Sequence, residues 1–332
     1  TGFPWLIMGS SLTGTHIDGW IPILGSYGTS LLLVIMSACL VLIIESTKRI
    51  ELSPILLLLI IFISSFALNK VNWTKESFSI EASIYQPNFS LQDKWSLKGL
   101  RSTKSLIEDA ILKANTNEFI FFPETTLITE RKKLEPWISN IEKEARKKNI
   151  SLISGIIASD LSQEGNLLQR YNRIQGFGSA SGYYDKIQLV PFGEYIPFRK
   201  SFGEILDFMG INLIDTLKGQ AYSTIKSGSI KISPSICYEI AFPNLVRKTA
   251  KNSDLLVTIS NDTWFGRSIG PEQHLEIAQT RALEHQKSLI RATNSGISAI
   301  ISREGKIEQR QNYFEEKNLE GKVMIYEGQT PY

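Results

Sequence analysis

The sequence predicts an α/β domain that follows two membrane-spanning helices. Near the start of the chain, two apolar runs are free of charged residues over lengths that suit a bilayer. From Ser77 onward, short apolar runs alternate with amphipathic stretches, as strands and helices do in α/β proteins. One of the apolar runs ends on Cys237, directly before a helix-like segment, which is the layout of a nucleophile held at a strand-to-helix turn.

The composition excludes several classes of function. The chain has 332 residues, with 36 Lys and Arg against 33 Asp and Glu and a formal charge of +3, so we expect no nucleic-acid binding. Cys39 lies inside an apolar run, so we expect no disulfide with Cys237. The sequence has no CxxC or HxxxH pattern, so we expect no metal site and place His274 and His285 at a surface or an interface. The chain does not open on Met, and we expect a piece of a longer protein.

Residues 20–44 form the first apolar run and residues 52–68 the second, which is near the lower length limit for a span. The alternative, two buried helices of a soluble core, fits the long uncharged first run less well. Lys48 and Arg49 lie in the connecting loop, which the positive-inside rule places in the cytoplasm. We therefore predict a membrane region over residues 1–76 and, on the other side of the membrane, a catalytic domain over residues 77–332.

Periodicity places the elements of this domain in order. Residues 78–85 alternate apolar and polar side chains as a half-buried strand does, and residues 95–114 have apolar side chains at helical spacing. Residues 195–220 have no clean period, and they form either a short core helix or an apolar lid able to dip into lipid. Further strands are predicted at 118–122, 150–158, 171–177, 181–188, 230–236, 255–260, 289–293 and 296–302, and further helices at 136–148, 240–251 and 271–286.

Cys237 is the candidate nucleophile. A helix beginning just after the sulfur brings backbone N–H groups and the positive end of the helix dipole close to it, which favours the thiolate. The alternative is a buried and inert cysteine, which is the commoner state of a lone cysteine. Two other charged residues at strand ends favour the catalytic interpretation.

Glu124 follows the apolar strand that ends in Phe122-Pro123, where a half-buried carboxyl group is able to exchange protons near neutral pH. Lys186 closes another predicted strand, and a Pro/Gly turn carries Glu194 just beyond it. Surface positions are the ordinary alternative for both Glu124 and Lys186. Taken with Cys237, Lys186 is instead placed to stabilise an oxyanion.

These stretches resemble the nitrilase (carbon–nitrogen hydrolase) superfamily, and most closely its membrane branch, the apolipoprotein N-acyltransferases. The resemblance covers nearly the whole chain, but members of that branch have more spans than the two found here and continue beyond the residues that match Tyr332. The matching motifs are Phe122-Pro-Glu124-Thr, Tyr171-Asn172, Leu189-Val-Pro-Phe-Gly-Glu194-Tyr, Cys237-Tyr238-Glu239, Asn261-Asp262-Thr-Trp264-Phe-Gly266 and Arg291-Ala-Thr-Asn294.

The resemblance implies an α-β-β-α sandwich with Cys237 as nucleophile, Glu124 as general base and Lys186 as oxyanion stabiliser. Supporting roles are implied for Glu194, which would hold Lys186, and for Asn172, Tyr238 and Glu239. Trp73 matches a tryptophan at the mouth of the lipid site, and Trp5 and Trp264 match further lipid-facing or structural aromatic residues.

The implied reaction moves a fatty acyl chain, through a cysteine thioester, to the N-terminal amine of a diacylated lipoprotein. The implied donor is a phospholipid resembling phosphatidylethanolamine. We expect a monomer in the bacterial inner membrane, with the catalytic domain on the periplasmic side and no cofactor. The alternatives are a membrane-tethered amidase that uses water as the acceptor, and a scaffold without enzymatic activity.

Overall fold

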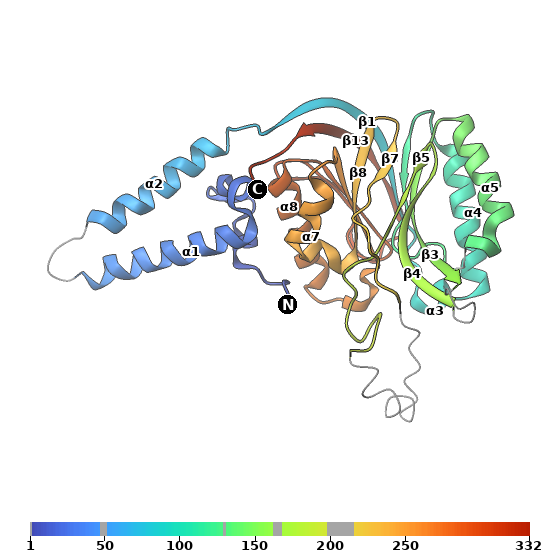
Figure 1. Cartoon of the computed structure of the whole chain (residues 1–332), viewed down its shortest axis with the longest axis horizontal. Helices are drawn as coiled ribbons and strands as arrows, with labels where there is room; N and C mark the ends of the chain where they lie inside the picture. Colours follow the sequence, from blue (N-terminus) through green and yellow to red (C-terminus); the bar gives the residue numbers. More distant parts are fainter. Residues whose placement is uncertain (1, 47–51, 129–130, 162–167, 198–215) are drawn as a thin grey trace, which may run out of the picture.

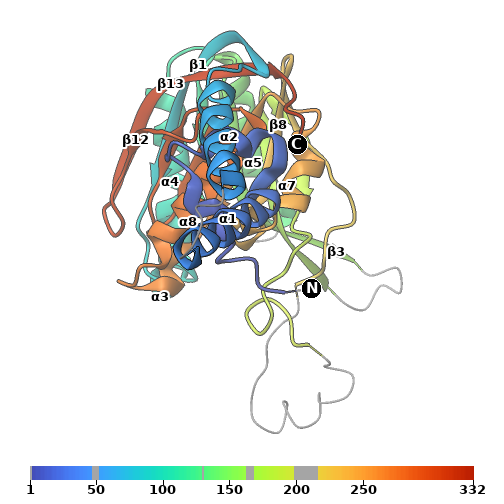
Figure 2. The ribbon, with the colours of Figure 1, turned by 90° about the vertical axis from the view of Figure 1, so that its left-hand side faces the viewer.

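The computed structural model describes residues 2–46, 52–128, 131–161, 168–197 and 216–332. Two β-sheets pack face to face, and helices cover the outer face of each sheet (Figure 1). This arrangement confirms the predicted α-β-β-α sandwich. The two N-terminal helices project from the side of the sandwich that α7 and α8 cover, as both views show (Figures 1 and 2).

The first sheet has the strand order β13-β1-β2-β3-β4-β6. Strands β1, β2 and β3 are parallel, so the residues that follow β1 and β2 leave the sheet at the same edge. The remaining neighbours pair antiparallel. The strands are β1 (Thr74–Gln86), β2 (Phe119–Phe121), β3 (Ser151–Leu161), β4 (Leu168–Gly178), β6 (Tyr183–Asp185) and β13 (Lys317–Gly328).

The second sheet has the order β12-β11-β10-β9-β8-β7-β5. Its three central strands, β8, β9 and β10, are parallel, and every residue of β9 and β10 is buried, as is usual for parallel strands covered on both faces. The strands are β5 (Ala180–Ser181), β7 (Ile225–Ser227), β8 (Ile230–Ile236), β9 (Leu255–Ser260), β10 (Leu289–Thr293), β11 (Ala299–Ile301) and β12 (Ile307–Arg310).

Three apolar layers hold the sandwich together. The central layer lies between the sheets and contains Phe121 and Ile236, the last residues of β2 and β8. A second layer joins the first sheet to α4 (Leu97–Lys113) and α5 (Arg131–Lys147), and a third joins the second sheet to α7 (Pro243–Ala250) and α8 (Gly270–His285). Each of β2 and β8 lies between the central layer and one outer layer, so the ends of these strands are held in place. The residues that follow them are therefore well positioned.

The N-terminal region consists of two short 3-10 helices, η1 (Met8–Leu12) and η2 (Asp18–Trp20), and the helices α1 (Ile21–Glu45) and α2 (Leu52–Leu68). Together with η2, α1 forms a 28-residue apolar helix that is long enough to cross a membrane. Helix α2 is apolar too, but has only 17 residues. Both helices expose many large apolar side chains, among them Leu31, Val41, Leu56 and Ile63, so neither is buried in the core of the sandwich.

Helix α1 is interrupted at Gly25, whose φ of 64° and ψ of 179° are not helical. The Cβ of any larger residue there would lie 2.1 Å from the Tyr332 ring, so the position requires glycine on two grounds. The Ser26 N–H that the break leaves unpaired donates to the carboxylate of Glu284 on α8, at 2.7 Å. Arg281 of α8 pairs with Glu284 and donates to the Ser26 hydroxyl.

Several elements differ from the sequence predictions. Strand β1 begins at Thr74, so the boundary predicted between residues 76 and 77 falls inside it. The single strand predicted at 181–188 is instead two short strands, because β5 joins the second sheet and β6 the first. Helix α5 begins before Pro136, since the turn that contains Leu134 packs into the core. The C-terminal β12 and β13 were not predicted, because charged residues interrupt their apolar pattern.

Candidate active site

Cys237 is the first residue after β8 and the first residue of a 3-10 helix, η3 (Cys237–Ala241). Its φ of 52° is left-handed, a backbone conformation that is strained for a residue with a Cβ. Contacts on both sides of Cys237 hold this turn. The Ile236 N–H donates to the carboxylate of Glu239 at 2.8 Å, and Nε2 of His274 lies 3.1 Å from the Cys237 carbonyl oxygen.

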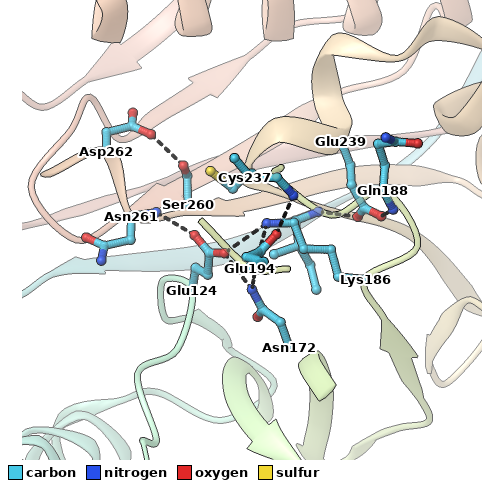
Figure 3. A network of polar contacts seen from close by, with 12 residues as sticks. Glu124, Asn172, Lys186, Gln188, Glu194, Cys237, Glu239, Ser260, Asn261 and Asp262 are labelled. Atoms are coloured by element: carbon cyan, nitrogen blue, oxygen red, sulfur yellow. Dashed lines mark hydrogen bonds and ion pairs between the residues drawn. The ribbon is translucent and has the colours of Figure 1, made fainter. Parts of the chain in front are cut away.

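Glu124 lies just beyond the end of β2, with its side chain only 6% exposed. Its two carboxylate oxygens face different partners. Oε1 accepts a hydrogen bond from Asn172 at 2.7 Å and lies 3.4 Å from the ammonium of Lys186 (Figure 3). Oε2 accepts from the N–H of Asn261, which follows β9, at 2.9 Å. Gly155 of β3 permits this turn, since a Cβ there would lie 2.5 Å from the nitrogen of Thr125.

Lys186 follows β6 and is the most buried charged group around Glu124, with 1% of its surface exposed. Its Nζ donates to Glu194 at 2.8 Å. Burial by itself would lower the pKa of Lys186, but the carboxylates of Glu124 and Glu194 outweigh burial and raise that pKa above its ordinary value. Lys186 therefore carries a full positive charge next to Glu124 at any pH at which the protein works.

Glu194 and Asn172 complete the polar contacts of Lys186 and Glu124. Asn172 Nδ2 reaches both carboxylates, since it also lies 3.0 Å from Glu194 Oε1. The second oxygen of Glu194 accepts from the N–H of Val190 at 2.8 Å, which closes the turn after Lys186. This turn keeps Glu194 beside Lys186 without the flexibility of an exposed surface pair.

Glu239 is fully buried behind the site and joins the two chain segments that carry Lys186 and Cys237. Its Oε1 accepts from the hydroxyl of Tyr184 at 2.8 Å and from the N–H groups of Ile187 at 2.7 Å and Gln188 at 2.9 Å. Its Oε2 accepts from the N–H of Ile236. Burial raises the pKa of Glu239 to about 7, and these hydrogen bonds oppose that rise.

The thiol of Cys237 lies next to the charged groups (Figure 3). Burial raises its pKa to about 12, and the Glu124 carboxylate adds to that rise, whereas Lys186 and a hydrogen bond with Ser260 act in the opposite direction. The sequence argument expected a helix N-terminus to favour the thiolate. That expectation is wrong for the resting site, because η3 is a single 3-10 turn and burial outweighs it. The sulfur rests as a thiol and needs a base when it reacts.

A second buried network, absent from the sequence predictions, lies behind Cys237. Asp262 accepts from Ser260, pairs with Arg291 and lies 3.0 Å from Nδ1 of His274. Burial alone would raise the pKa of Asp262, but Arg291 and His274 hold it far below its usual range. The surface or interface positions expected for the histidines are wrong, since His274 and His285 are both buried. The signal available in the sequence was Asn261-Asp262, two polar residues directly after an apolar strand.

The aromatic residues fall into two groups. The ring of Trp5 packs at a tilt against His274 and Phe265, with centroids 5.1 and 5.4 Å away, and its Nε1 donates to Gln273. Since His274 contacts the Cys237 carbonyl, Trp5 lies near the turn at Cys237. Trp264, in η4 (Asp262–Phe265), is 77% exposed. Tyr238 points toward the N-terminal segment, where its ring lies 5.7 Å from Phe3 and 4.8 Å from Phe242.

Trp73 lies away from Cys237, and its place at the mouth of a lipid site stays a prediction. The main-chain N–H of Trp73 donates to the side chain of Gln286, the residue that caps the C-terminal end of α8. His274 contacts Cys237 near the other end of the same helix. At a rise of about 1.5 Å per residue, these two positions on α8 are roughly 18 Å apart. A tryptophan that the sequence argument left out is closer: Trp95 is half-exposed and follows Lys94, whose ammonium contacts the Glu124 main chain.

Most of the lid predicted at residues 195–220 lies outside the described residues, which omit 198–215. Its described flanks meet beside the site, because the N–H of Thr216 donates to the Glu194 carbonyl and the N–H of Gly219 to the Lys186 carbonyl, both at 2.8 Å. Within the described ranges, no group of three or more His, Cys, Asp or Glu side chains is arranged to hold a metal ion.

Comparison with known proteins gives the family. Residues 82–327 match the carbon–nitrogen hydrolase family. Curated apolipoprotein N-acyltransferases match over the whole chain, with 36% identity for the protein from Wigglesworthia glossinidia brevipalpis and 33% for that from Pseudomonas syringae pv. tomato. The chain belongs to the carbon–nitrogen hydrolase family, in the branch of the apolipoprotein N-acyltransferases. It spans 67% and 66% of the length of these two relatives.

Solved structures of carbon–nitrogen hydrolases share the fold of this member of the family. A Saccharomyces cerevisiae protein from branch 10 of the nitrilase superfamily superposes with a TM-score of 0.55 at 19% identity, covering 76% of this chain and 92% of that one. A superfamily protein from Xanthomonas campestris gives a TM-score of 0.53 at 15% identity, covering 74% and 91%. At these identities the likeness concerns the fold of the sandwich, not its chemistry.

Proposed function

We propose that this chain carries the reaction centre of an apolipoprotein N-acyltransferase, with Cys237 as nucleophile, Glu124 as general base and Lys186 as oxyanion stabiliser. The observation that carries the proposal is the geometry of Glu124. One carboxylate oxygen faces Lys186, and the other is fixed by the N–H of Asn261, in the same buried site as the Cys237 thiol. A base, a cation and a thiol from three separate strand ends therefore share one enclosed space.

In the first half-reaction, the Cys237 sulfur attacks an ester carbonyl of a phospholipid while Glu124 takes the thiol proton. Because the thiol has a pKa of about 12, proton transfer has to accompany attack. The Lys186 ammonium stabilises the oxyanion, and loss of such a donor costs about 10²–10³-fold in rate. The carbon–oxygen bond then breaks, Glu124 returns the proton to the departing lysophospholipid, and a thioester remains on Cys237.

In the second half-reaction, the N-terminal amine of a diacylglyceryl-cysteine attacks the thioester carbonyl. A carbon–nitrogen bond forms and the carbon–sulfur bond breaks. The proton lost by the amine passes through Glu124 to the leaving sulfur, which restores the thiol. All of this chemistry is carried by side chains of this chain, so the proposed mechanism needs no cofactor.

The N-terminal helices support a lipid substrate. Their exposed apolar surface suits a bilayer, Trp5 lies near Cys237, and Trp264 is exposed, and amphipathic aromatic rings suit a lipid–water boundary. Lys48 and Arg49, which lie outside the described residues, come between the two helices in the sequence, and the positive-inside rule favours the cytoplasm for them. The catalytic domain would then lie on the periplasmic side of the bacterial inner membrane. We propose that α2 spans the membrane with α1, and that the protein acts as a monomer.

The test uses the detergent-solubilised protein with phosphatidylethanolamine alone. We expect an acyl adduct by intact-mass measurement that hydroxylamine removes, as it does a thioester. Cys237→Ser should lose the hydroxylamine-labile adduct, and the matched variant Cys39→Ser should keep it, since Cys39 lies in α1. An adduct that survives in Cys237→Ser and stays labile would contradict the assignment of the nucleophile.

A second measurement identifies the acceptor. A synthetic diacylated lipopeptide is added to the acylated protein, and its mass should rise by one acyl chain as the thioester disappears. If free fatty acid appears while the lipopeptide stays unchanged, the acceptor is water, and the amidase-like alternative replaces the transferase.

A further inference from the structure

A second buried lysine lies beside Glu124. Lys94 is the last residue of α3 (Leu91–Lys94), and only 4% of its surface is exposed. Its Nζ donates to the main-chain carbonyl oxygen of Glu124 at 2.8 Å. Lys186 contacts the carboxylate of the same residue, so Glu124 lies between two ammonium groups that reach different parts of it.

The two lysines differ in how their charge is balanced. Lys186 pairs with the carboxylates of Glu194 and Glu124. The contact of Lys94 is with a neutral carbonyl oxygen, and among the described residues no ion pair joins it to a carboxylate. Burying an ammonium without an ion pair is costly, so a lysine in this position needs a compensating interaction.

The compensating interactions involve the reacting groups. Burial lowers the pKa of Lys94 to about 8, and the charge of Glu124, together with that of Cys237 when its thiol is ionised, opposes that decrease. Electrostatic coupling is reciprocal, so a positive Lys94 stabilises the Cys237 thiolate by as much as the thiolate stabilises Lys94. The other charged groups nearby face Glu124 or Cys237 rather than Lys94, and they are Lys186, Glu194 and Asp262.

We propose that Lys94 is a second cationic residue of the site, which positions Glu124 through its main-chain carbonyl and stabilises the developing thiolate of Cys237. This role rests on the proposed function of Cys237 as nucleophile. The two lysines then have different roles. Lys186 is paired with carboxylates and stabilises the oxyanion, whereas Lys94 acts on Glu124 and on the Cys237 sulfur.

The test measures alkylation of Cys237 by iodoacetamide between pH 6.5 and 10, by peptide mass, in the Cys39→Ser background. Alkylation requires only the thiolate, so its outcome is independent of whether the protein transfers acyl chains. In the wild type, we expect the rate to rise with pH, level off for about one pH unit above pH 8 as Lys94 loses its charge, and then rise again.

Lys94→Met removes the charge with little change in volume. We expect its rate to be about tenfold lower below pH 8, since one pKa unit of the thiol is a factor of ten in thiolate, and to rise without a plateau. Lys94→Arg keeps the charge at every pH, so it should retain the wild-type rate at pH 7 and also lack the plateau. The fold of each variant is checked by its melting temperature.

The matched control is Lys287→Met. Lys287 is also buried, its pKa is also lowered to about 8 by burial, and its ammonium donates to the main-chain carbonyls of Ala250 and Ser253, away from the site. We expect Lys287→Met to keep the wild-type profile and its plateau. The proposal is overturned if Lys94→Met keeps the plateau, or if Lys287→Met shows the same loss. If Lys94→Met does not fold, a wild-type profile without a plateau near pH 8 overturns it equally.

Discussion

The ammonium of Lys186 lies closer to Glu194 than to Glu124, at 2.8 Å against 3.4 Å. Glu194 makes the shorter ion pair with Lys186, whereas the carboxylate of Glu124, which also raises the pKa of Lys186, lies farther from the ammonium. This asymmetry matters because a carboxylate locked to an ammonium is a weaker base. The structure supports different roles for the two glutamates even though both contact Lys186 and Asn172.

Replacing Glu194 by Gln tests this division. The amide keeps the size of the side chain but not its charge. The Lys186 ammonium should therefore move toward the Glu124 carboxylate, which makes Glu124 a weaker base. We expect thioester formation to slow on the order of 10–100-fold. The measurement is the rate of adduct formation by mass spectrometry, with Glu144→Gln on the exposed face of α5 as the control. An unchanged rate in Glu194→Gln would show that Glu124 does not depend on its neighbour.

Replacing Glu124 by Gln should separate reactivity of the sulfur from catalysis. The Glu124 carboxylate is one of the groups that raise the pKa of Cys237, so its removal lowers that pKa. We expect alkylation of Cys237 at pH 8 to become about tenfold faster, in line with a change of one pKa unit. Thioester formation from phospholipid should be lost, because the proton acceptor is missing. A variant in which both rates fall would contradict the electrostatic argument.

Replacing Glu239 by Gln tests the connection between the Lys186 and Cys237 segments. All four hydrogen bonds to this side chain come from donors, and the NH₂ of Gln would face a main-chain N–H. Leaving such a buried group unsatisfied costs about 1–3 kcal/mol. We expect a lower melting temperature and slower thioester formation in Glu239→Gln. Glu239→Asp keeps the charge, but its side chain is too short to reach the same donors, so we expect both effects there too. Unchanged stability in Glu239→Gln would rule out the structural role.

The buried His285 makes stability depend on pH. Burial lowers its pKa to about 3 from an ordinary value of 6.5. The unfolded chain therefore binds a proton more readily, so the contribution of neutral His285 is complete above pH 6.5 and is lost as the pH falls from 6.5 toward 3. At pH 5 the loss is about 2 kcal/mol. We expect His285→Gln to flatten the decrease in melting temperature between pH 7 and pH 5, and an equally steep decrease would contradict this.

The layered fold was predictable because, from Ser77 onward, the spacing of the apolar residues distinguishes strands from helices. The same signal predicted that the site residues converge, since Lys186 and Cys237 directly follow a strand and Glu124 comes three residues after one. The polar residues behind the site were harder to find. Lys94 lies in α3, a short helix that the sequence analysis did not predict, and His274 lies on a helix where a surface or interface position was expected. Both side chains are buried. Trp73 was placed at the site by likeness alone, and the length of α8 separates it from Cys237.

The break in α1 has a mechanical consequence. The break at Gly25 leaves the main-chain N–H of Ser26 free to donate to Glu284 of α8. The same helix contains His274, which contacts the Cys237 carbonyl oxygen. In the membrane arrangement proposed above, α1 and the turn that carries Cys237 are therefore joined to opposite ends of α8. The length of this helix then sets the distance between the sulfur and the lipid.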